Sequence, residues 1–159
     1  MRRMLRHETD DQAVEIVGLL DEFQAAERAG AEAVEAWVGV CRDARLRGGL
    51  KVVRTRDLGH ASLAEGRLRA LGGVPSVRVG RELASLLAML ASPEVSDRAK
   101  LAALLARFPG GLEDPLAAVV RRIERDDETR SLLETIADDE RTTLAWLRRM
   151  SDTLEHEQA

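Results

Sequence analysis

A chain of 159 residues is the size of one domain and is long enough to bury a substantial core. The sequence holds two Phe, two Trp and no Tyr, so Leu, Val and Ala must build that core, which favours packed helices over a β-sandwich. The net charge of −4 argues against general binding to nucleic acid or to an anionic membrane surface. Cys41 is the only cysteine, which excludes an internal disulfide and a thiolate metal cluster.

Residues 1–9 are predicted to be a flexible lead-in, and residues 10–155 to form one helical domain. No stretch approaches the roughly 20 uncharged apolar residues of a membrane span, and no signal peptide is apparent, so we expect a cytoplasmic protein. Apolar residues recur at helical spacing to about residue 45, and Gly48-Gly49 predicts the end of this first helix or its connection. A second helix is predicted over about 50–71, ending at Gly72-Gly73.

The middle of the chain predicts shorter elements. Short helices are expected over residues 82–91, 93–107 and about 113–123, with the strongest helix-breaking cluster at Phe108-Pro109-Gly110-Gly111. The last of these is either a new helix or the continuation of a kinked one. A final long helix is predicted over about 128–154. Because no strand-like alternation occurs, the fold class is all-α: an antiparallel four-helix bundle with extra short helices in its middle crossover.

Acidic residues and a histidine interrupt the apolar stripes of three predicted helices. Glu27 lies on the stripe of the first helix, Asp57 and His60 lie on the second, and Glu140 lies on the last. An ionised acid inside a core costs several kcal/mol unless it is paired or binds a metal. A shared divalent cation would satisfy all of these groups, and carboxylates with one imidazole suit iron, manganese or zinc.

The segments Glu27-Arg28-Ala29-Gly30, Asp57-Leu58-Gly59-His60 and Glu140-Arg141-Thr142-Thr143 resemble the ferritin-like superfamily, rubrerythrin-type members more than cage-forming ferritins. Such proteins hold two metal ions with one Glu from the first and third helices and Glu-x-x-His from the second and fourth. Here the second motif has an aspartate for its glutamate, and the fourth has a threonine for its histidine.

The acid expected on the third helix has no clear position, and Glu113 is the nearest candidate. The resemblance therefore implies one site made by Glu27, Asp57, His60 and Glu140, and a second site that keeps at most Glu113 and the bridging acids. We expect a ferritin-like protein with a degraded, mononuclear site for one Fe, Mn or Zn ion. Weak oxidoreductase work or metal handling would be its role, and whether it is an enzyme stays open. A homodimer through an apolar helix face is also expected, with no nucleic-acid or membrane partner.

The alternative is a non-catalytic helical interaction or scaffold module that binds no metal. In that case Glu27 would pair with an arginine, and His60 would form a hydrogen bond with Asp57 or Thr143 in a polar core network. Glu113 would then be a helix-start acid favoured by the helix dipole. Loss or retention of metal-dependent thermal stabilisation in His60→Ala separates the two hypotheses.

Overall fold

The computed structural model describes residues 2–109 and 115–156, and within these ranges every regular element is an α-helix. This confirms the all-α prediction. The elements in chain order are α1 (Arg2–Val40), α2 (Ala44–Ala70), α3 (Arg81–Ala91), α4 (Asp97–Leu105), α5 (Pro115–Val120) and α6 (Asp127–His156). Among the described residues, no helix is both long enough and apolar enough to cross a membrane.

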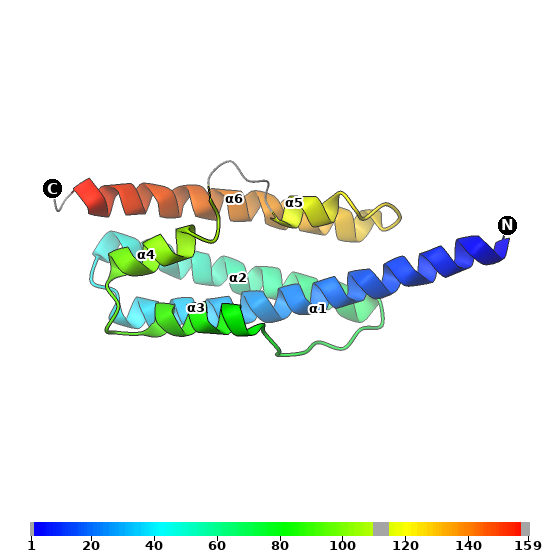
Figure 1. Cartoon of the computed structure of the whole chain (residues 1–159), viewed down its shortest axis with the longest axis horizontal. Coiled ribbons are helices and arrows are strands. Elements are labelled where there is room, and N and C mark those ends of the chain that lie inside the picture. The colour runs from blue at the N-terminus through cyan, green and yellow to red at the C-terminus, as the bar shows by residue number, and fades with distance from the viewer. Residues whose placement is uncertain (1, 110–114, 157–159) are drawn as a thin grey trace.

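The long helices α1 and α2 lie side by side, and α2 folds back along α1 (Figure 1). On one side α3 packs against α1, while α6 contacts α2 and is accompanied by α4 and α5 along its own length. Two apolar clusters fill the interior. One surrounds the fully buried Trp37 near the α1–α2 connection, and the other surrounds Leu20, Leu68 and Leu133.

The connection between α1 and α2 differs from the prediction. The first helix ends at Val40 rather than near residue 45, and Gly48 and Gly49 lie inside α2. Asp43 caps α2 because its carboxylate accepts hydrogen bonds from two backbone N–H groups of the first turn. Gly49 is required by packing, since a Cβ atom built there would lie 1.9 Å from Cζ2 of Trp146. A close approach between helices, rather than a helix end, explains this glycine.

The other boundaries agree with the sequence prediction only in part. The first helix already begins at Arg2, before the predicted start near residue 10, whereas α3 matches the prediction for 82–91. Helix α4 begins at Asp97 and not at 93, because the Ser96 side chain accepts a hydrogen bond from the backbone N–H of Ala99 and caps the helix there. Helix α5 is a separate helix, which answers the question left open by the break at 108–111.

Candidate metal centre

The structure brings together four of the five predicted ligands. Glu27 of α1, Asp57 and His60 of α2, and Glu140 of α6 each offer one ligand atom, and these atoms all lie within 4.8 Å of one another. Glu113 lies outside the described residues. The four side chains thus form one acidic cluster with a single imidazole, contributed by three helices.

Helical spacing explains why these residues meet. The apolar stripe of α2 buries Leu50 and Leu46 in one cluster and Ala64 and Leu68 in the other, so His60 lies in the stretch between them. The stripes of α1 and α6 pass from one cluster to the other in the same way. A polar layer therefore separates the two apolar parts of the interior.

His60 is the centre of this layer and is only 4% exposed. Its Nδ1 atom lies 3.4 Å from Oε2 of Glu27 and 3.3 Å from Oε1 of Glu140. These contacts do not have hydrogen-bond geometry: Glu27 Oε2, His60 Nδ1 and Glu140 Oε1 are buried and have no hydrogen-bond partner among the described residues. Buried polar atoms without partners are rare and costly. Three of them converging on one point fit a bound cation, whose ligands need no hydrogen between them.

The four-residue cluster retains protons. Burial raises the pKa of Glu27. Burial, followed by the charges of Glu27 and Glu140, raises the pKa of Asp57 to about 8. For His60, burial alone would lower the pKa, but contacts with Glu140, Glu27 and Asp139 outweigh it and raise the pKa to about 10. At neutral pH the cluster therefore holds protons on Asp57 and His60, and a metal ion would have to displace them.

Asp139 is a site residue that the sequence reasoning missed. Its Oδ2 atom lies 3.1 Å from Nε2 of His60, on the opposite side of the ring from Glu27 and Glu140. When the imidazole is neutral, an Nε2–H group donating to Asp139 leaves the Nδ1 lone pair facing the other carboxylates. Asp139 precedes Glu140 directly, but its side chain is 44% exposed, so it lies off the apolar stripe that revealed the other acids.

The contacts predicted for a metal-free network are not the ones formed. His60 forms its hydrogen bond with Asp139 rather than with Asp57 or Thr143. Thr143 Oγ1 instead accepts a hydrogen bond of 3.0 Å from Arg56. Glu27 has its ion-pair contact with His60, while the neighbouring Arg28 pairs with another acid on α2 at 2.6 Å. A polar core network without metal would therefore have to use Asp139 as the hydrogen-bond partner of His60, and not Asp57 or Thr143.

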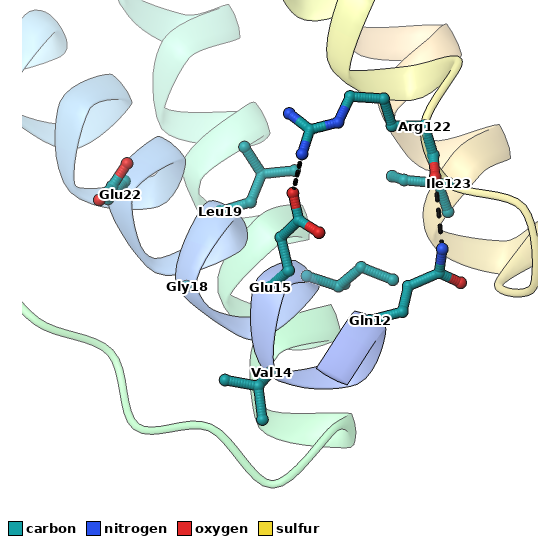
Figure 2. Close-up of a pocket in the computed structure, with 9 residues that line it drawn as sticks. Gln12, Val14, Glu15, Gly18, Leu19, Glu22, Arg122 and Ile123 are labelled. Carbon is teal, nitrogen blue, oxygen red and sulfur yellow. Dashed lines mark hydrogen bonds and ion pairs between the residues drawn. The ribbon is translucent and has the colours of Figure 1, made fainter. Parts of the chain in front are cut away.

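A surface pocket of about 310 Å³ lies away from this cluster, between α1 and residues 122–123 (Figure 2). Arg122 forms an ion pair with Glu15 there, and the Gln12 side chain donates to the backbone carbonyl of Arg122 at 3.3 Å. These contacts join α1 to the segment that precedes α6. Since the lining includes none of the four clustered residues, the pocket gives no access to them.

No protein-family model, curated protein or solved structure matches this chain. What the cluster does must therefore be inferred from its own geometry and chemistry.

Proposed function

We propose that the chain is a ferritin-like metal-binding protein that holds one divalent cation, iron, manganese or zinc, between Glu27, Asp57, His60 and Glu140. The observation that carries the proposal is the convergence of three buried atoms, one from each of Glu27, His60 and Glu140, that lack hydrogen-bond partners in the part of the chain that the structure describes. Their helices are also fixed by packing that does not involve the cluster, so the ligand atoms are preorganised.

We propose in addition that the helices form a ferritin-like four-helix bundle. Helices α1, α2 and α6 would be the first, second and fourth helices of an antiparallel four-helix arrangement. The third would be divided into α4 and α5 by the Pro-Gly-Gly break, with α3 in the crossover. The packing of both α4 and α5 on α6 supports this interpretation. A third helix broken near the position of the expected acid would also account for a site with one ion rather than two.

The roles of the residues follow from their chemistry. Three carboxylates and one imidazole are a set of hard and borderline donors that suits Fe²⁺, Mn²⁺ or Zn²⁺ over soft ions such as Cu⁺. Glu27, Asp57 and Glu140 would neutralise the ion, and Asp139 would orient the His60 ring through Nε2. Bound metal would supply Lewis-acid or one-electron redox chemistry, depending on the ion. Metal handling or weak oxidoreductase work would be its use.

A scaffold module without metal is the second candidate. Two features favour this candidate: the hydrogen bond between His60 and Asp139, and a protonated imidazole that faces Glu27 and Glu140. These contacts offset part of the free-energy cost of burying the charged side chains, and they need no metal ion. On this hypothesis the cluster only joins α2 to α1 and α6. Homodimer formation through an apolar helix face and a cytoplasmic location stay predictions under both candidates.

Metal binding to wild type, His60→Ala and His156→Ala tests the proposal. His156 is the matched control, because it is an exposed histidine at the end of α6. After EDTA treatment, each protein is incubated with Fe²⁺ under anaerobic conditions, with Mn²⁺ or with Zn²⁺. Metal per chain and thermal unfolding are then measured. At 100-fold excess over its dissociation constant, an ion should stabilise wild type and His156→Ala by about 2.7 kcal/mol.

His60→Ala should lose most of this stabilisation, because one of four ligands is removed. The proposal is wrong if wild type retains less than about 0.1 metal ion per chain with each of the three ions. A scaffold network instead predicts that His60→Ala lowers stability by the same amount with and without metal.

A further inference from the structure

Arg56 lies beside the candidate metal centre and is half-buried between α2 and α6. Its guanidinium donates hydrogen bonds to Oγ1 of Thr143 at 3.0 Å and to the backbone carbonyl of Asp139 at 3.4 Å. Both acceptors are in the turn of α6 that contains Glu140, and Arg56 directly precedes Asp57 on α2. Of the three clustered carboxylates, Glu140 is thus in the turn that Arg56 contacts, and Asp57 is its neighbour in sequence.

The partners of Arg56 distinguish it from three arginines of α2, whereas Arg47 resembles it in donating, among the described residues, only to a neutral oxygen, the backbone carbonyl of Cys41. Arg54 pairs with Glu35 at 2.7 Å, Arg67 with Asp126 at 2.8 Å, and Arg69 with Glu65 at 2.8 Å. Within the described part of the chain, Arg56 has no carboxylate within ion-pair distance and binds neutral oxygens only. Its positive charge is thus not neutralised by an acid of its own, and it lies against the turn of α6 that carries Glu140.

A charge count shows what this does to metal binding. Once a metal ion has displaced the protons, Glu27, Asp57, Asp139 and Glu140 carry four negative charges. One divalent cation together with Arg56 leaves the partly buried centre with a net charge of −1. A second divalent cation would raise it to +1 with Arg56 present, and to zero without Arg56. The guanidinium repels any cation, but only the second ion leaves an excess of positive charge in a desolvated place, so Arg56 disfavours the second ion more than the first.

This inference rests on the proposed function. We propose that Arg56 is a specificity-determining residue: its side chain occupies the space between α2 and Thr143, and its positive charge limits the centre to one divalent cation. Replacing it by an uncharged residue should let a second ion bind beside the first. The carboxylates of Asp57, Asp139 and Glu140 would supply the ligands for that ion.

Mn²⁺ titrations of wild type, Arg56→Gln and Arg54→Gln test this inference. Arg54→Gln is the matched control, since it removes the same charge two residues away, from a pair on the surface. The number of bound ions per chain is measured by elemental analysis after gel filtration, and low-temperature EPR reports whether two Mn²⁺ ions are magnetically coupled. Circular dichroism confirms that each variant is folded. If Arg56→Gln does not fold, Arg56→Leu combined with Thr143→Val replaces both members of the hydrogen bond by apolar groups and takes its place.

Wild type and Arg54→Gln should saturate at one Mn²⁺ per chain. The uncharged Arg56 variant should approach two, with coupled EPR signals and at least about tenfold tighter binding of the second ion than in wild type. Saturation of the variant at one ion, or of wild type at two, would overturn the role of Arg56 and leave metal binding intact. Wild type that binds no Mn²⁺, Fe²⁺ or Zn²⁺ would instead overturn the proposed function, and with it this inference.

Discussion

Replacing Asp57 by asparagine should stabilise the metal-free protein while removing its response to metal. Asparagine has nearly the same shape but cannot ionise. The folded protein raises the pKa of Asp57 from 3.8 to about 8, because burial and the neighbouring glutamates disfavour the charged form. The folded state therefore keeps a proton that the unfolded chain releases. The free energy of unfolding falls as pH rises from about 4 to about 8, and it stays low above that range.

The magnitude follows from these two values. At pH 7 the chain must take up a proton at Asp57 on folding, about three pH units above its unfolded pKa, which costs about 4 kcal/mol. Local relaxation and water penetration reduce this value, and we expect Asp57→Asn to raise the free energy of unfolding by about 2 kcal/mol. For a domain of this length that corresponds to roughly 4–8 °C in Tm. A buried acid that destabilises the metal-free protein is typical of a residue kept for function.

Urea unfolding in EDTA, followed by circular dichroism at about pH 4, 6 and 8, measures the effect. The difference between Asp57→Asn and wild type should be small at the lowest pH and should grow towards the highest. Asp138→Asn is the matched control, because Asp138 is an exposed aspartate of α6 paired with Arg141 at 2.9 Å, and its effect should stay small throughout. A destabilised Asp57→Asn at pH 7, or a difference that does not change with pH, would refute the reasoning. With metal added, only wild type and Asp138→Asn should gain stability.

Two further predictions concern the pH dependence of metal binding and the packing of α2. Affinity for Mn²⁺ should rise between about pH 6 and 8, because Asp57 and His60, with pKa values of about 8 and 10, must release protons to the solvent when metal binds. Calorimetric titrations at both ends of this range check it, and an affinity that does not change would contradict proton displacement. Gly49→Ala should lower stability by about 1–3 kcal/mol, because its Cβ atom would overlap the Trp146 ring. Gly48→Ala, with no atom within 4 Å of the added Cβ, should instead stabilise α2 by up to about 1 kcal/mol, and thermal unfolding distinguishes the two.

Most of the helices could be predicted from the sequence, because an amphipathic stripe is a local property. The exception at Gly48-Gly49 shows the limit of local reasoning. Two adjacent glycines are unfavourable in an isolated helix, yet α2 continues through them, since the Trp146 ring packs where a side chain at 49 would be. Trp146 is almost 100 residues further along the chain, so neither residue by itself indicates the other.

The candidate site divides in the same way. Glu27, Asp57, His60 and Glu140 could be found from the sequence, because each stands where an apolar stripe calls for an aliphatic residue. That signal exists only for side chains on the core face of a helix. An interrupted apolar stripe does not show which side chains meet across helices. It also does not identify functional residues at the boundary between core and solvent.

Asp139 and Arg56 lie on that boundary, and only the tertiary structure decided their place. Each is a charged residue at a partly exposed position, as many surface residues of α2 and α6 are. Their contacts with His60 and Thr143 depend on the distance and rotation between two helices whose contacting residues are 79 and 87 positions apart. The sequence determined which side chains must be buried, because burial follows helical periodicity. The packing of α2 against α6 decided which charges surround them, because electrostatic partners are set by distance in space.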